Sequence, residues 1–280
     1  MAVSVSNAFV TLFDSEVKHS YQGQRSLAGL TRERTVEGST VKFPKIGKGT
    51  ASIRVPQTDV TPMSVVYSQV QAVMSDFIAA EYSDIFNQAK INFQDRAELV
   101  QVVGGAIGRR MDQVVLDALT AASGTLTVAN SVGGSNTNLN VAKLRDIKKQ
   151  MDAKNVPSDN RVIVAHANSM DALLSETSVT SSDFNSVKAL VTGQVADNTF
   201  LGFRFVQLGD RDEGGLAIDG SSDRTIFAFH KDAMGLGINM AEKTKVDYIP
   251  EKTSFLVASM FSAGAVAIDP DGICKVTCRE

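Results

Sequence analysis

The strongest constraint on the fold is a stretch of about 27 residues in which an apolar residue recurs at every fourth position. The recurring residues are Leu99, Val103, Ile107, Met111, Val115 and Leu119. Asn92 is a candidate N-cap for the helix that this spacing predicts, and Asp95 and Glu98 favour its first turn. At 1.5 Å per residue, a helix of about 27 residues is about 40 Å long, which is long for a globular domain.

Three glycines interrupt the helical pattern, at Gly104, Gly105 and Gly108. Each costs up to about 1 kcal/mol relative to alanine in a helix interior. Their presence predicts that another backbone packs closely against the helix, or that the helix bends there. A dinucleotide-binding loop is a poor alternative, because the spacing differs and the glycines do not lie at a strand-to-helix turn.

Residues 36–56 predict a long hairpin. Apolar and polar residues alternate in 40–43 and again in 51–55, and the glycine-containing segment between them supplies the turn. Pro44 and Pro56 cannot donate ladder hydrogen bonds, so these strands cannot lie at the centre of a sheet. A two-stranded ribbon alone is marginally stable in water. Two interpretations stay open: the ribbon packs on a neighbouring subunit, or it is an ordinary edge hairpin on its own domain.

The hairpin lies in a basic part of an acidic chain. Residues 1–54 carry eight Lys and Arg against four Asp and Glu, a surplus of four, whereas the whole chain has a net charge of −3. This asymmetry indicates contact with an oppositely charged surface, for which another copy of the chain is a candidate. The candidate contact residues are Arg32, Arg34, Lys42, Lys45, Lys48 and Arg54. The overall negative charge argues against a dedicated nucleic-acid binder.

The remaining patterns predict a mixed α+β chain. Residues 1–35 show no sustained periodicity and are expected to form an arm that lies along another surface and is not a packed element. Phe77–Ala89 has helical spacing, and Asn140 is expected to cap a short amphipathic helix. Residues 123–138 are predicted to form a loop and 269–272 a type I turn. The predicted strands are 66–74, 161–165, 203–208, 225–230, 245–249 and 255–268.

Patterns typical of enzymes are weak. His19, His166 and His230 show no metal-ligand spacing, and a hydrolase that uses His166 or His230 lacks a recognisable nucleophile motif. The acidic residues of 210–213 could bind a divalent cation, but a solvated loop is the favoured interpretation. We therefore expect no catalytic, cofactor-binding or metal-binding residue. Cys274 and Cys278 are expected to be reduced thiols.

Five stretches carry a resemblance to a known family. They are Val41–Gly49, Val55–Pro62, Ala80–Phe86, Glu98–Arg110 and Ala263–Pro270. These stretches resemble the shell proteins of short-tailed marine phages, and their order resembles the major capsid proteins of tailed bacteriophages, which share the Hong Kong 97-type fold. The resemblance covers nearly the whole chain.

The resemblance implies a set of parts. These are an N-terminal arm (1–35), an extended loop (36–75), a short helix and a spine helix (76–122), a peripheral domain (123–155 and 225–280) and an axial domain (156–224). It also implies assembly into hexamers and pentamers, and an icosahedral shell around DNA that is contacted without base readout. A portal protein and a separate scaffolding protein are the expected partners, and a decoration protein is a further candidate.

Some relatives join a loop lysine to an asparagine of a neighbouring subunit, but this sequence identifies no acceptor. The longest apolar run, Phe255–Ile268, is too short to span a bilayer, which takes about 20 residues. The chain opens without a signal peptide, so assembly is expected in the cytoplasm of a host bacterium, and the final location in the virion capsid. An encapsulin-like compartment shell is the alternative that shares the fold, and an unrecognised α+β hydrolase is the alternative that does not.

Overall fold

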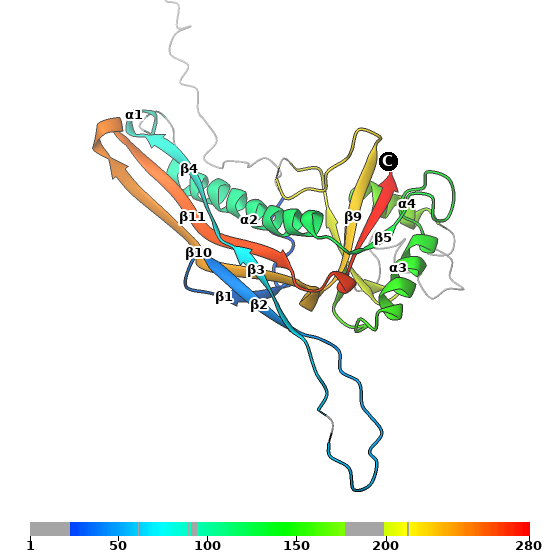
Figure 1. Ribbon diagram of the computed structural model, residues 1–280. Coiled ribbons are helices and arrows are strands. Elements are labelled where there is room, and N and C mark those ends of the chain that lie inside the picture. Colours follow the sequence, from blue (N-terminus) through cyan, green and yellow to red (C-terminus); the bar gives the residue numbers. More distant parts are fainter. Residues whose placement is uncertain (1–22, 61, 89, 91–93, 177–198, 212) are drawn as a thin grey trace, which may run out of the picture.

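The computed structural model describes residues 23–280, apart from 61, 89, 91–93, 177–198 and 212 (Figure 1). One sheet of four strands, in the order β1-β10-β11-β4, forms a long platform. β1 runs parallel to β10, and the other neighbours are antiparallel. The strands are β1 (Arg32–Thr35), β10 (Met234–Ile249), β11 (Ser254–Ala267) and β4 (Ser75–Asp84).

A second sheet of six strands lies at the other end of the molecule, in the order β5-β12-β9-β6-β8-β7. Its strands are β5 (Leu126–Val128), β12 (Ile273–Arg279), β9 (Asp223–His230), β6 (Arg161–His166), β8 (Phe203–Leu208) and β7 (Thr199–Phe200). Every residue of β6 is buried, which confirms the strand predicted over 161–165. Helices α3 (Val141–Ala153) and α4 (Ala167–Leu174) lie beside this sheet. Short 3₁₀ turns η3 (Lys231–Ala233), η4 (Pro250–Lys252) and η5 (Pro270–Gly272) connect strands that follow one another in the chain; η3 and η5 link the two sheets.

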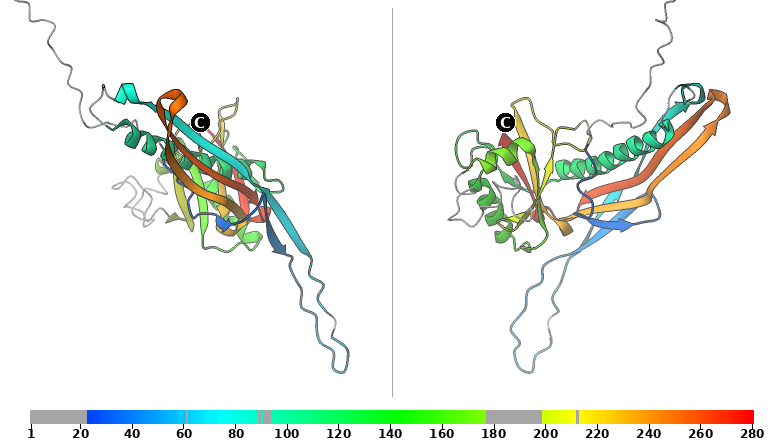
Figure 2. Two further views of the ribbon diagram at one scale, coloured as in Figure 1. Left: turned by 90° about the vertical axis from the view of Figure 1, so that its left-hand side faces the viewer. Right: turned by 180° about the vertical axis from the view of Figure 1, so that it is seen from behind.

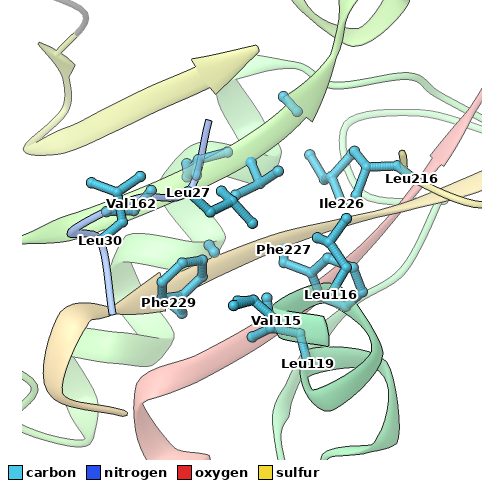
Figure 3. Packing of buried hydrophobic residues seen from close by; sticks show 14 of the residues in the cluster. Leu27, Leu30, Val115, Leu116, Leu119, Val162, Leu216, Ile226, Phe227 and Phe229 are labelled. Carbon is cyan, nitrogen blue, oxygen red and sulfur yellow. The ribbon is translucent and has the colours of Figure 1, made fainter. Parts of the chain in front are cut away.

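Helix α2 (Asp95–Ala121) joins the two sheets. Five of the six residues at the fourth positions are buried and Leu99 is half-buried, so the long helix is confirmed. Along the platform, Phe77 and Phe261 stack with centroids 5.0 Å apart, and the guanidinium of Arg110 lies 4.6 Å from the centre of the Phe77 ring. Toward its end, the helix buries apolar side chains in the same core as β6 and β9 (Figure 3). The predicted N-cap, Asn92, lies outside the described residues.

The helix predicted over Phe77–Ala89 is wrong for most of its length. Residues 75–84 form strand β4, and only α1 (Ile85–Gln88) is helical. β4 pairs with β11 over its whole length, from Ser75 opposite Ala263 to Asp84 opposite Ser254. The pairing satisfies the strand's backbone and stacks Phe77 on Phe261, and this tertiary gain outweighs a local pattern that suits a helix.

The hairpin prediction was correct in its first strand and wrong in its partner. β2 (Thr40–Ile46) pairs antiparallel with β3 (Tyr67–Val73), not with 51–55. Val41, Phe43 and Ala72 pack with Ile268 in a small separate core, which gives β3 apolar contacts that 51–55 lacks. Residues 47–66 consequently form the loop at the end of the ribbon, and Pro44 lies in a strand at the edge of a two-stranded sheet.

The N-terminal segment is anchored on its own chain. Leu27 and Leu30 are buried in the main core, and β1 extends the platform beside β10. The expectation of an arm that is not a packed element is therefore wrong for residues 23–35. The part expected over 1–22 lies outside the described residues.

Local signals elsewhere were correct. Asn140 caps α3, because its Oδ1 accepts the backbone N–H of Lys143 at 2.7 Å. The turn at 269–272 is closed by the N–H of Gly272, which donates to the carbonyl of Asp269 at 3.1 Å. The loop expected over 123–138 is an exception, because it contains the short strand β5, which pairs with β12. Cys274 and Cys278 are buried free thiols, as expected; burial raises their pKa values to about 12 and about 11.

The two sheets divide the chain differently from the ranges that the resemblance implied. The six-stranded sheet takes β5 from 123–155, β6 and β8 from 156–224, and β9 and β12 from 225–280. The platform takes β10 and β11 from the last of these ranges. The molecule is therefore organised as a platform with α2 and a six-stranded body, and the chain passes between them near residues 122, 233 and 268.

Candidate intersubunit surfaces

The extended loop is the most exposed part of the described chain. Beyond the last ribbon pair, Ile46 with Tyr67, the described residues of 47–66 are exposed except for Val65, which is half-buried. The loop carries apolar side chains into solvent, and Ile53 is 96% exposed. The other exposed apolar residues of the ribbon and loop are Ile46, Val55, Val60, Met63, Val66, Tyr67 and Val73. Exposed apolar side chains in this number on one projecting segment are typical of an interaction site.

The six candidate basic residues do not form one patch. Arg32 and Arg34 lie on β1, and Lys42 lies on β2. Lys48 and Arg54 lie in the exposed loop. Lys45 differs from the rest, because its Nζ lies 2.8 Å from Oδ1 of Asp269 in the same chain. Lys48 and Arg54 are therefore the best placed of the six to meet a neighbouring copy.

The three helix glycines differ in their surroundings. A Cβ added at Gly108 would lie 3.2 Å from Cβ and 3.4 Å from the backbone nitrogen of Arg25. At Gly104, the nearest atom would be a side-chain oxygen of Glu242, at 3.5 Å. Gly105 is half-buried. The N-terminal segment thus approaches the helix closely at Gly108, and a packing role for Gly104 and Gly105 stays a prediction.

A buried carboxylate fastens the N-terminal segment one turn further along the helix. Asp112 is fully buried, and its oxygens accept the backbone N–H groups of Ser26 at 2.7 Å and Leu27 at 3.0 Å. Arg211 lies 3.4 Å from the same carboxylate and also donates to the carbonyl of Gln24 and the hydroxyl of Ser26. Burial raises the pKa of Asp112, opposed by these amides and by the charge of Arg211. Asp112 was missed in the sequence, although a carboxylate four residues from Gly108, among buried positions of a helix, is a signal of a buried polar contact.

The residues considered for catalysis hold the fold together. His166 and His230 start α4 and η3, where each Nδ1 accepts a backbone N–H, at 3.3 and 3.2 Å. They lie at opposite ends of β6, since His230 pairs with Arg161. His166 also lies within 3.2 Å of Asp210 and Glu280.

The carboxylates of 210–213 face cations of the same chain. Asp210 lies 3.5 Å from Arg224, and Glu213 lies 3.2 Å from Arg110. Asp212 is outside the described residues. Among the residues that the structure describes, no group of His, Cys, Asp and Glu is arranged to hold a metal ion, and no helix is long and apolar enough to cross a membrane.

A second exposed apolar area was also missed by sequence reasoning. It lies at the far end of the platform, on β4 and α1 (Figure 2). Its members are Ile78, Tyr82, Ile85 and Phe86. Val246 and Tyr248 are exposed on the opposite face of the sheet, because β11 aligns them with Glu81 and Ser83 of β4. The assignment of 77–89 to a helix hid this area, because a strand directs alternate side chains to opposite faces and leaves Ile78 and Tyr82 on the outside.

Comparison with known proteins decides what these surfaces belong to. A family model described as phage capsid protein matches residues 5–280. The chain belongs to this family. It is a structural subunit, the major capsid protein of a tailed phage, and it forms the shell of the virion together with further copies of itself. No curated protein matches the chain.

Solved phage capsids share the fold of this capsid protein. The capsid of cyanophage P-SCSP1u superposes with a TM-score of 0.79 at 16% identity, over 99% of this chain and 95% of that one. The capsid of Helicobacter pylori bacteriophage KHP30 gives 0.78 at 10% identity, over 99% and 97%. A chain of Mycobacterium phage Che8 gives 0.73 at 17% identity, over 97% of both chains. The Hong Kong 97-type fold is thereby confirmed, and neither the compartment shell nor the hydrolase is favoured.

Proposed function

We propose that the capsid protein closes into hexamers and pentamers through its extended loop, and that these tile an icosahedral shell around phage DNA. The observation that carries this proposal is the loop itself. Residues 47–66 extend beyond the small core at the base of the ribbon and expose both apolar and basic side chains. Such a segment gains contacts only by docking on another molecule, and heterologous contacts that close into rings generate capsomers.

In this proposal the parts have the roles that the resemblance implied, but the peripheral and axial domains follow the two sheets and not the ranges 123–155, 156–224 and 225–280. Residues 1–35 are the arm, 36–75 the extended loop and 76–122 the segment that contains the spine helix α2. The platform strands supply the peripheral domain and the six-stranded body the axial domain. DNA is contacted without base readout, consistent with the net charge of −3. We further propose a separate scaffolding protein, a portal protein, assembly in the host cytoplasm, and no catalytic role for any residue. A decoration protein is an additional partner to test for.

The test reverses the free charges of the loop. Lys48→Glu with Arg54→Glu should leave a folded subunit that no longer forms shells, because both side chains are exposed within their own chain and charge complementarity orients docking. Lys48→Arg with Arg54→Lys is the matched control and should assemble. Negative-stain microscopy counts the shells, and circular dichroism verifies the fold. Normal shells from the charge-reversed variant would contradict the proposal.

A further inference from the structure

The loop contains a strand-like segment that has no strand partner within the described chain. Ala51, Ile53 and Val55 alternate with Ser52 and Arg54. This alternation suits a strand with one apolar and one polar face. All five residues are exposed, and the segment belongs to none of the described strands. The segment therefore has the periodicity of a strand but is exposed to solvent and unpaired within the described chain.

The platform, in turn, has an open edge. β1 covers only the first part of β10, pairing Arg32–Thr35 with Gly235–Ile238. Beyond Ile238, no described strand lies on that side of β10, although β11 pairs with its other side as far as Ile249. Every residue from Asn239 to Tyr248 is exposed. An open edge of this length presents backbone N–H and C=O groups that accept an additional strand.

The faces of the edge and of the segment match. Thr244, Val246 and Tyr248 share one face of β10, and Val246 and Tyr248 are 43% and 46% exposed on it. Lys243, Lys245 and Asp247 occupy the opposite face. A strand added here would extend the first face with Ile53 and Val55, and the charged face with Ser52 and Arg54. Apolar side chains would then adjoin apolar ones, and Arg54 would join the row that contains Asp247.

The segment cannot reach this edge within one molecule. In all three views the loop points away from the body, whereas the open part of β10 leads to the opposite end of the platform (Figures 1 and 2). We propose that Ala51–Val55 of one copy adds as a strand to β10 of a neighbouring copy, opposite Thr244–Tyr248. This inference rests on the proposed function, and it names the surface on which the loop docks. Backbone pairing supplies the affinity in this mode of recognition, and alternate side chains supply the specificity.

Cross-linking tests the pairing in assembled shells. Ile53→Cys is combined in turn with Thr244→Cys, Val246→Cys or Tyr248→Cys, and the shells are oxidised. Directly opposed residues of neighbouring strands have Cα atoms about 4.5–5.5 Å apart, within disulfide range. The native thiols do not compete, because both are buried. We expect one combination to convert most subunits into covalent oligomers on a non-reducing gel. The matched control joins Ile53→Cys with Ile78→Cys, a residue 68% exposed on the strand at the other edge of the platform, and should stay monomeric on the gel.

The outcomes separate this inference from the proposed function. Intact shells without oligomers, or equal oligomers from the Ile78→Cys control, overturn the strand pairing; if charge reversal of Lys48 and Arg54 still abolishes shells, the loop docks elsewhere. If the charge-reversed variant still forms shells, the proposed docking through the loop is refuted, and with it the strand pairing that rests on it. If a double-cysteine variant does not assemble, the strand pairing is tested instead by comparing the shell yields of Ser52→Pro and Ile53→Pro. Only alternate N–H groups of an added strand face its partner, so one of these two variants should lose shell yield and the other should keep it. Equal yields refute the pairing.

Discussion

Replacing Asp112 with alanine should detach the N-terminal segment from the spine helix. The carboxylate is fully buried and accepts two backbone N–H groups, at 2.7 and 3.0 Å, with Arg211 at 3.4 Å. Removing one partner from a buried charged network costs about 3–5 kcal/mol, because the remaining charge and donors lose their partner. Asp112→Asn keeps one acceptor oxygen, and a loss of about 1–3 kcal/mol is expected. The assay is urea unfolding of unassembled subunits followed by circular dichroism.

The matched control for this prediction is Glu213→Ala. Glu213 pairs at 3.2 Å with Arg110, which lies on the same helix as Asp112, but the side chains of Glu213 and Arg110 are 44% and 35% exposed. Exposed ion pairs contribute about 0–1 kcal/mol, so this variant should unfold near the wild-type urea concentration. Limited trypsin digestion adds a local readout, since Arg25 should become cleavable in Asp112→Ala before the body unfolds. If Asp112→Ala matches Glu213→Ala in both assays, the carboxylate does not anchor the segment.

Three further predictions follow from buried or crowded positions. Gly104→Ala should raise the unfolding free energy by up to about 1 kcal/mol, whereas Gly108→Ala should not, because its Cβ would lie 3.2 Å from a neighbouring side chain; thermal unfolding of both variants compares them. Cys274 and Cys278 should stay unmodified by a thiol reagent at pH 8 until urea unfolds the subunit, since burial raises both pKa values; a fast reaction of the folded protein would refute this. Burial alone would raise the pKa of Glu280, but hydrogen bonds and charge from its neighbours hold that pKa below the ordinary value. The stability that Glu280 contributes is present above the unfolded pKa and is lost as pH falls through the folded pKa, so the difference between wild type and Glu280→Gln should shrink on acidification. A difference that is constant between pH 7 and pH 3 would show that the charge of Glu280 contributes nothing.

Sequence reasoning succeeded where local chemistry decides the structure. The apolar spacing of α2, the Asn140 cap and the turn at Asp269 each depend on residues within a few positions of one another. These signals act in the unfolded chain as well, so they can be recognised without the rest of the fold.

Sequence reasoning failed where the structure of a segment depends on pairing with a strand far along the chain. Residues 77–84 pair with a strand about 180 residues later, and no local pattern contains that partner. The true partner of β2 was likewise passed over for a nearer segment with the same alternation. Lys143 is fully buried because its Nζ donates to the carbonyls of Thr137 and Thr277, one of which lies over 130 residues away. A lysine in an amphipathic helix gives no sign of such an arrangement, since lysine is almost always exposed.

The strand order of the platform also governs when a subunit can become competent to assemble. β1 can pair only after β10, about 200 residues later in the chain, has been synthesised, and β4 can pair only after β11 has been synthesised. At about 5–20 residues per second, a ribosome leaves the early strands without partners for roughly 10–40 seconds. The ribbon of β2 and β3, by contrast, has both of its strands within residues 40–73 and can close early. A nascent chain thus displays its loop long before it possesses β10, so unfinished chains on one message cannot yet accept the loops of their neighbours by strand pairing. Shell growth is thereby restricted to chains that have reached their last strands.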